Sequence, residues 1–129
     1  MQIDVTSDTF RLAQVFTISR GSRTEAQVLT VRISDGGVTG MGECVPYARY
    51  GETLESVTAQ IEGLSGALTR QGLYDLLPAG AARNAVDCAL WDLEAKQSGT
   101  PVWQLAGLDP LRPEITAYTL SLDTPENMR

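Results

Sequence analysis

The stretch AGAARNAVDCALWDLEAKQ, residues 79–97, decides the fold, because it predicts one long helix that is apolar over much of its circumference. Its many small residues allow another helix or a sheet to approach closely. Gly99 supplies a helix C-cap, and Pro101 prevents the helix from continuing. We therefore expect this helix to lie at the centre of the core. One of its faces consists of Ala82, Ala85, Val86, Ala89, Leu90 and Leu93.

A second amphipathic helix is predicted on the N-terminal side of this stretch, over residues 54–68. Thr53 is a good N-cap for it. Apolar residues then recur at the helical spacing of three and four, which gives one apolar stripe. Gly63 and Gly66 weaken this helix by about 1 kcal/mol each relative to alanine. The stripe consists of Leu54, Val57, Ile61, Leu64 and Leu68.

The first 45 residues predict strands, because they are rich in Val, Ile, Thr and Phe. We expect strands over residues 2–12, 13–19, 26–33 and 38–44, joined as an antiparallel meander of three or four strands. SDGG, residues 34–37, is a strong hairpin turn. SRGSRTE, residues 19–25, is interpreted as a loop, and the glycines of the last strand, Gly40 and Gly42, indicate a bulge or a close backbone approach.

The C-terminal residues predict the beginning of a different domain. LDPLRPE, residues 108–114, contains two prolines and is typical of a linker. EITAYTLSL, residues 114–122, is a clear strand pattern, and Thr124 could begin a helix directly after it. A strand that leads into a helix is half of a βα unit, which needs a following parallel strand. We therefore expect a small α+β domain at residues 1–107, a linker at 108–113, and the first strand and helix start of a larger α/β domain at 114–129.

The composition argues against several classes of partner and location. The net charge is −6 and no Lys/Arg cluster occurs, which argues against nucleic acid or an anionic membrane as a partner. No stretch has the length and hydrophobicity of a transmembrane helix, and the N-terminus lacks the apolar core of a signal peptide. Cys44 and Cys88 show no CxxC spacing and are interpreted as buried free thiols in a reducing cytoplasm, with a disulfide between them left open.

Residues suited to proton transfer are scarce. The chain has no histidine, and Lys96 is its one lysine, placed near a helix end where we expect it to be solvated. The acidic residues lack a spacing that would gather ligands around one hard cation. We expect Glu43 to anchor the loop that follows it rather than to take part in chemistry. The sequence therefore predicts no catalytic residue and no metal ligand in these 129 residues.

Three long stretches carry a resemblance to a known family. ISRGSRTEAQV (residues 18–28), GECVPYARYGET (42–53) and LPAGAARNAVDCALWDLEAK (77–96) together resemble the N-terminal capping domain of the enolase superfamily. Within it they are most similar to the muconate-lactonizing branch, and in that branch to the dipeptide epimerases that interconvert L-Ala-L-Glu and L-Ala-D-Glu. ITAYTLSLDTPENM (115–128) resembles the first strand and helix of that family's (β/α) barrel. The resemblance thus implies an α+β cap, a strand meander followed by a helical bundle, with the first strand of a barrel that is otherwise absent.

The resemblance also implies an isomerase reaction, proton abstraction α to a carboxylate. In that family two lysines on opposite faces of the substrate exchange the proton, and three barrel carboxylates hold Mg²⁺. None of these groups can be assigned to this chain. We therefore expect the chain alone to be inactive, with Mg²⁺ bound by the barrel, and with the barrel domain and a dipeptide as partners. The resemblance leaves a homo-oligomer open.

Specificity is the contribution that the resemblance assigns to a cap, because two of its loops close over the barrel mouth and exclude water. By this resemblance, Arg23 occupies the position at which the dipeptide epimerases place an arginine against the glutamate carboxylate of the substrate. Tyr50 in the second loop, residues 46–53, is expected to line the pocket, and Thr119 in the barrel strand to bind substrate near the barrel mouth. We thus predict Arg23, Tyr50 and Thr119 as substrate-binding residues.

Two other readings fit the same residues. One keeps the fold and changes the reaction, to a cycloisomerase or an o-succinylbenzoate synthase. The other is a self-standing binding or assembly module, whose barrel-facing surface would need another partner.

Overall fold

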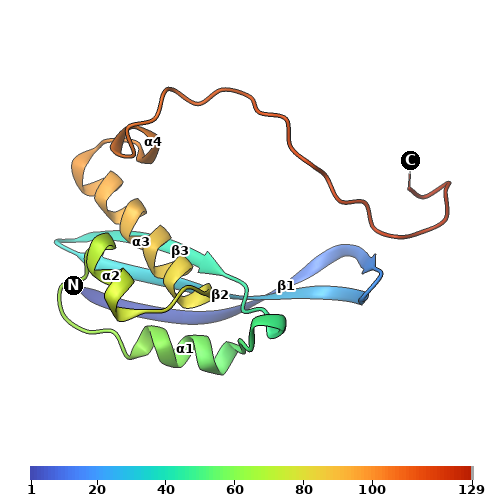
Figure 1. The fold of residues 1–129 in the computed structure, drawn as a ribbon, viewed down its shortest axis with the longest axis horizontal. Coiled ribbons are helices and arrows are strands. Elements are labelled where there is room, and N and C mark those ends of the chain that lie inside the picture. The colour runs from blue at the N-terminus through green and yellow to red at the C-terminus, as the bar shows by residue number, and fades with distance from the viewer. Residues whose placement is uncertain (129) are drawn as a thin grey trace. The chain divides into compact units, whose positions relative to one another are not determined.

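The structure is a computed structural model that describes residues 1–128. Its elements follow in the order of three strands and then helices, as the sequence predicts for an α+β fold (Figure 1). The chain forms two compact units, one of residues 1–8 and 28–110, the other of residues 9–27 and 111 onward. The elements are β1 (Gln2–Ile18), β2 (Gly21–Asp35), β3 (Val38–Cys44), η1 (Ala48–Tyr50), α1 (Leu54–Glu62), α2 (Arg70–Leu76), α3 (Ala81–Ser98) and α4 (Val102–Leu105).

The sheet has three strands in the order β1-β2-β3. β2 and β3 pair in antiparallel fashion, from Leu29 opposite Cys44 to Asp35 opposite Val38. Gly36 and Gly37 join them with φ values of 57° and 81°, so the predicted hairpin turn is confirmed. The division of the first 19 residues into two strands was wrong. β1 is one strand of 17 residues, because neither glycine nor proline interrupts it.

The expected loop at residues 19–25 is also corrected. Only Ser19 and Arg20 form the turn, and β2 starts at Gly21. Gly21 has a φ of 136°, a left-handed conformation that glycine adopts at no steric cost, so the chain can reverse within two residues. Arg23 therefore lies on a strand and not in a loop.

The long helix α3 lies at the centre of the core of the first unit, as predicted. Its six buried residues are those expected from the spacing of apolar side chains. α3 packs against β3, and α1 and α2 pack against α3 (Figure 1). A Cβ built on Gly40 would overlap the Ala89 carbonyl oxygen, and one built on Gly42 would overlap the Ala85 carbonyl oxygen. The close backbone approach that the sequence indicated is therefore present, and glycine is required at both positions.

The helix predicted over residues 54–68 is shorter than expected. Thr53 caps α1 in a reciprocal capping box with Ser56, in which Ser56 N–H donates to Thr53 Oγ1 over 3.1 Å. The helix ends at Glu62, before the two glycines, and Gly66 has a left-handed φ of 83°. A separate helix, α2, follows with Thr69 as its N-cap, and sequence analysis missed it. Leu68 still contributes to the core from the connecting segment.

Two side chains of α3 bind the backbone of β3 on the side away from β2. The Met41 N–H donates to Asp92 Oδ2 over 2.8 Å, and Lys96 Nζ donates to the Thr39 carbonyl oxygen over 2.9 Å. Lys96 and Asp92 also form an ion pair of 2.6 Å. Burial alone raises the pKa of Asp92, but the hydrogen bonds from Lys96 and Met41 together outweigh it and lower that pKa. Lys96 is therefore a bound residue and not merely a solvated one.

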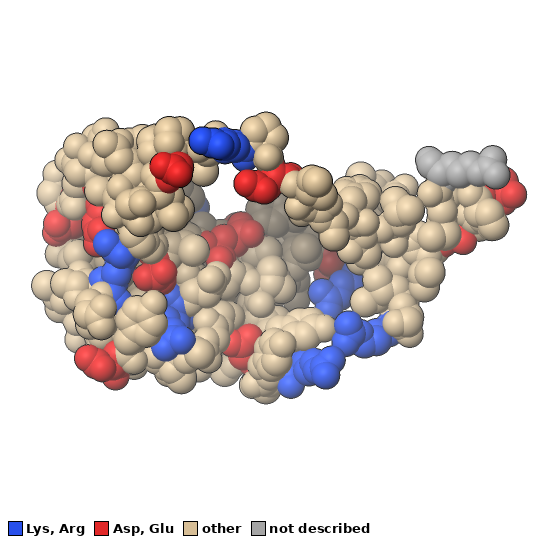
Figure 2. All heavy atoms as spheres, turned by 45° about the horizontal axis from the view of Figure 1, so that its top comes forward, with Lys and Arg blue, Asp and Glu red and all other residues tan. Residues whose placement is uncertain are grey.

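Charged side chains of both signs are interspersed over the helical part of the surface (Figure 2). Arg70 illustrates this arrangement, since its Nη2 lies 3.0 Å from Glu94 Oε2 and its guanidinium lies 3.4 Å from the centre of the Trp91 ring. Within residues 1–128, no helix is both long and apolar enough to cross a membrane.

The strand predicted over residues 114–122 does not form. That segment has no regular secondary structure, and all of its residues except Ser121 are exposed, with Ile115 at 103% and Tyr118 at 87% exposure. A strand requires backbone hydrogen bonds to a neighbouring strand, and among the described residues only the end of this segment makes one, from the Leu122 N–H to the Thr17 carbonyl oxygen of β1. Thr124 begins a turn, in which its carbonyl oxygen accepts from the Asn127 and Met128 N–H groups over 3.0 and 3.1 Å.

Candidate functional site

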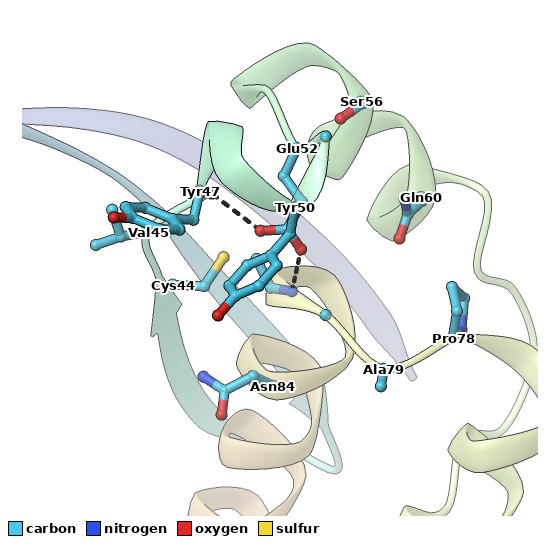
Figure 3. A pocket seen from close by; sticks show the side chains of 13 residues that line it. Cys44, Val45, Tyr47, Tyr50, Glu52, Ser56, Gln60, Pro78, Ala79 and Asn84 are labelled. Atoms are coloured by element: carbon cyan, nitrogen blue, oxygen red, sulfur yellow. Dashed lines mark hydrogen bonds between the residues drawn. The ribbon is translucent and has the colours of Figure 1, made fainter.

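A cavity of the first unit lies where the end of β3, the loop after it (residues 46–53) and the start of α3 meet. It has a volume of about 670 Å³ and is open to solvent. Figure 3 shows side chains from these elements and from α1 around it. The lining residues are Cys44, Val45, Tyr47, Tyr50, Gly51, Glu52, Ser56, Gln60, Pro78, Ala79, Gly80, Ala81 and Asn84.

Glu52 connects the loop to the central helix. Its Oε2 accepts the Tyr47 N–H over 2.9 Å, and its Oε1 accepts the Ala81 N–H over 2.7 Å (Figure 3). Ala81 is the first residue of α3, so the carboxylate binds an unpaired N–H at the positive end of the helix dipole. A Cβ on Gly80 would lie 2.8 Å from Glu52 Oε1, so the glycine makes room for this contact. Glu52 thereby fixes the loop against α3.

Sequence analysis assigned this anchoring role to the wrong glutamate. Glu43 lies in β3 opposite Thr30, with no side-chain hydrogen bond among the described residues. Glu52 was not singled out, because its partner Ala81 lies 29 residues away and no local pattern reports such a contact. One sequence feature did indicate that α3 needs a partner for its first N–H groups. The N-cap of α3 is a glycine, which has no side chain to bind them.

Replacing Glu52 with glutamine is expected to lower the free energy of unfolding by about 1.5–3 kcal/mol, because two charge-assisted hydrogen bonds are weakened and one amide must face an N–H donor. Urea unfolding monitored by circular dichroism measures the change. Glu43→Gln is the matched control, since it removes the same charge nearby without breaking a side-chain hydrogen bond. Equal midpoints for the two variants would contradict the anchoring role of Glu52.

Tyr50 projects over the cavity from the one-turn helix η1. Gly51 ends η1 with a left-handed φ of 76°. The Tyr50 side chain is 77% exposed, and its ring centre lies 5.6 Å from that of Tyr47 at an interplanar angle of 54°. Figure 3 shows the ring directed toward Cys44 and the first turns of α3. The predicted residue thus lines the cavity, with an aromatic face and a hydroxyl group free for contact.

The two cysteines are both free thiols, so the disulfide left open by the sequence does not form. Cys44 is buried beside the cavity as expected, whereas Cys88 is exposed and corrects the expectation that both are buried. Burial, followed by the nearby charges of Glu52 and Glu43, raises the pKa of Cys44 to about 11. The pKa of Cys88 is also raised, by partial burial and then by Asp87.

A chromogenic disulfide reagent at pH 8 is expected to react in two phases. Cys88 gives the faster phase, because it is accessible, and Cys44 reacts slowly, because it is buried and remains protonated at pH values well below 11. Both rates should rise with pH, since the thiolate is the reactive form. Cys88→Ser should remove the fast phase alone, and a single phase of two equivalents from the folded protein would contradict this assignment.

The other two predicted substrate-binding residues belong to the second unit. Arg23 lies on β2 and Thr119 in the extended C-terminal segment, and both are exposed. No hydrogen bond or ion pair joins Arg23, Tyr50 and Thr119 within the part of the chain that the structure describes. Their roles in substrate binding therefore stay predictions.

Acidic and sulfur-containing side chains do not gather into a metal site. Among residues 1–128, no group of three or more His, Cys, Asp or Glu residues is placed to hold a metal ion. The described residues thus offer no set of ligands that fits Mg²⁺, and we assign no metal-dependent step to them.

Comparison with known proteins supports the reading of the fold. Residues 1–107 match the N-terminal domain of the mandelate racemase/muconate lactonizing enzyme family. The chain belongs to this family. The three-stranded sheet with its helices is therefore the α+β N-terminal cap domain of the enolase superfamily.

Relatives of the family cap are dipeptide epimerases and related racemases. The L-Ala-D/L-Glu epimerase of Escherichia coli (strain K12) is 45% identical over 98% of this chain and 40% of its own length. An N-acetyl-D-glutamate racemase of a Pseudoalteromonas species is 45% identical over 79% of this chain and 34% of its own length. The chain thus spans about 40% or less of the curated relatives it matches.

Solved structures of the family show the same fold. An enolase family member from Agrobacterium tumefaciens with homology to dipeptide epimerases, crystallised with sodium and L-Ala-L-Glu and with an ordered loop, has a TM-score of 0.89 at 54% identity. It aligns over 98% of this chain and 40% of its own chain. The dipeptide epimerase of Methylococcus capsulatus, crystallised with Mg and L-Arg-D-Lys, has a TM-score of 0.73 at 32% identity, over 82% and 34% of the two chains.

Proposed function

We propose that this chain is the specificity cap of an epimerase that inverts the α-carbon of the glutamate in a dipeptide such as L-Ala-L-Glu. The observation that carries the proposal is the 54% identity, over 98% of this chain, to a family member crystallised with L-Ala-L-Glu. The match covers 98% of this chain. It therefore includes the three segments that hold the predicted substrate-binding residues: the β1–β2 ribbon (residues 9–27), the loop of residues 46–53 and the C-terminal segment.

Within this proposal the chain binds and orients the substrate. Arg23 is exposed and forms no ion pair among residues 1–128, so its guanidinium is free for a carboxylate. We assign it to the side-chain carboxylate of the substrate glutamate. Tyr50 would cover the substrate and exclude water, and Thr119 would contact it from the first barrel strand. We assign proton transfer and Mg²⁺ binding to a barrel domain outside these residues. The chain spans 40% of the E. coli epimerase, which leaves room for such a domain in the relatives.

A second substrate has a specific observation in its favour. The racemase of Pseudoalteromonas acts, by its name, on N-acetyl-D-glutamate and is as identical to this chain as the epimerase of E. coli. L-Ala-Glu and N-acetylglutamate share an N-acylated glutamate with two carboxylates, and they differ in the ammonium group of the alanine. Arg23 suits both, so the test must compare the two substrates directly.

The test joins residues 1–129 to the part of the E. coli epimerase that follows the aligned region. Exchange of the substrate α-proton for deuterium, followed by NMR with Mg²⁺ present, reports the reaction. We expect the hybrid protein to exchange L-Ala-L-Glu faster than N-acetyl-L-glutamate, and the chain alone to exchange neither. A folded hybrid that exchanges neither substrate would overturn the proposal, as would exchange by the chain alone. The reverse preference would favour the racemase.

A further inference from the structure

We propose that Ser121 is a positioning residue that ties the tip of the β1–β2 ribbon, residues 9–27, to the C-terminal segment, and so holds Arg23 in place for an acidic substrate. This inference rests on the function proposed above. It is carried by hydrogen bonds within the second unit, to which both segments belong.

The first observation is a set of three hydrogen bonds between residues more than 100 positions apart. Ser121 Oγ accepts the Thr17 N–H over 2.9 Å and donates to the Val15 carbonyl oxygen over 3.3 Å. The Leu122 N–H donates to the Thr17 carbonyl oxygen over 2.8 Å. One hydroxyl group thus uses both its donor and its acceptor on the same strand.

The second observation is where these bonds lie on the ribbon. β1 is an edge strand of the sheet, and along a strand the backbone groups of residues i and i−2 point to the same side. Thr17 and Val15 therefore present their bonded groups to the edge of β1 that β2 does not occupy. Ser121 and Leu122 satisfy that open edge as the beginning of a further strand would.

The third observation is that Ser121 is more buried than its neighbours in the sequence. From residue 104 to residue 127 every residue except Ser121 is exposed, and Ser121 alone is partly buried. The contact at this residue is thus where the C-terminal segment meets the ribbon, and the flanking residues carry no comparable burial.

The link continues across the ribbon to Arg23. Thr17 Oγ1 and Ser22 Oγ share a hydrogen bond of 2.8 Å across the two-residue turn, and Ser22 directly precedes Arg23 on β2. Ser121 fixes Thr17, Thr17 is bonded to Ser22, and Ser22 sets the backbone beside Arg23. A ribbon held in this way offers its guanidinium with little ordering cost on binding.

The test uses two readouts. In the 129-residue chain, hydrogen exchange of the Thr17 amide is measured by NMR for the parent, Ser121→Ala and Ser121→Thr. In the hybrid protein described above, kcat/KM is measured for L-Ala-L-Glu and for the neutral dipeptide L-Ala-L-Gln. Ser65→Ala is the control, because Ser65 is exposed, lies outside the ribbon and has no side-chain hydrogen bond among the described residues.

We expect Ser121→Ala to speed Thr17 exchange about tenfold and to lower kcat/KM for L-Ala-L-Glu about tenfold, mainly through KM, while L-Ala-L-Gln changes little. Ser121→Thr should restore both, since it keeps the hydroxyl. A general folding defect would lower both substrates equally. An unchanged preference between the substrates in Ser121→Ala overturns the positioning role, even if Thr17 exchange rises. Unchanged exchange overturns the link itself. An inactive parent hybrid instead contradicts the proposed function, and the exchange result still decides the link.

Discussion

Replacing Gly42 with alanine is expected to destabilise the protein by about 3 kcal/mol or more. The new Cβ would overlap the carbonyl oxygen of Ala85, which belongs to the backbone of α3 and cannot rotate away. Relief requires moving the helix off β3, and that movement would open the core around Val31 and Ala89, both fully buried. Urea unfolding monitored by circular dichroism measures the change.

Two further variants serve as comparisons for Gly42→Ala. Gly40→Ala should have a comparable effect, because its Cβ would overlap the Ala89 carbonyl oxygen in the next turn of α3. Gly63→Ala is the control, since Gly63 ends α1 with a helical φ of −70° and faces no other element. Its expected change lies within about 0.5 kcal/mol. If Gly42→Ala unfolds at the parent's midpoint, the close approach of α3 to β3 is refuted.

Replacing Arg23 with glutamine is expected to lower kcat/KM for L-Ala-L-Glu about 100-fold in the hybrid protein. The reason is that a carboxylate brought into a closed site would lose its partner charge and both members of a bidentate hydrogen bond. Arg23→Lys should recover only part of this loss, because an ammonium group cannot form the same paired contact. Deuterium exchange at the substrate α-carbon provides the rate.

Arg20→Gln is the matched control for this prediction. Arg20 lies three residues away in the turn of the same ribbon, so its loss removes the same charge from the same part of the chain. We expect it to change kcat/KM less than threefold. A similar loss in both variants would indicate general electrostatic attraction of the substrate and would exclude a specific contact with Arg23.

Local sequence patterns predicted those structural elements that are determined by residues close together in the sequence. The spacing of apolar residues gave the buried face of α3, the Asp-Gly-Gly turn gave the β2–β3 hairpin, and Thr53 gave the start of α1. Each depends on helical periodicity, on backbone conformations that glycine permits, or on a capping hydroxyl. The close contact of helix and strand could be predicted as well, since Gly40 and Gly42 leave room for a backbone.

Features that depend on distant partners were not predicted. Glu52 binds Ala81, and Lys96 binds Thr39, through contacts over 29 and 57 residues. The strand predicted over residues 114–122 does not form, because a strand needs hydrogen bonds along its length, and only Ser121 and Leu122 bond to β1. The same limit applies to the site, because Arg23, Tyr50 and Thr119 were selected by resemblance and the structure places them in two separate units.

The attachment of Asp92 and Lys96 to β3 has a consequence for self-association. Those two side chains occupy outward-facing backbone groups of Met41 and Thr39, so another polypeptide cannot add to the sheet there without displacing an ion pair. At high concentration, amyloid-like stacking or exchange of strands between copies would therefore start from the opposite border of the sheet. Solubility of this protein should accordingly respond to charge substitutions along β1 far more than to those along β3.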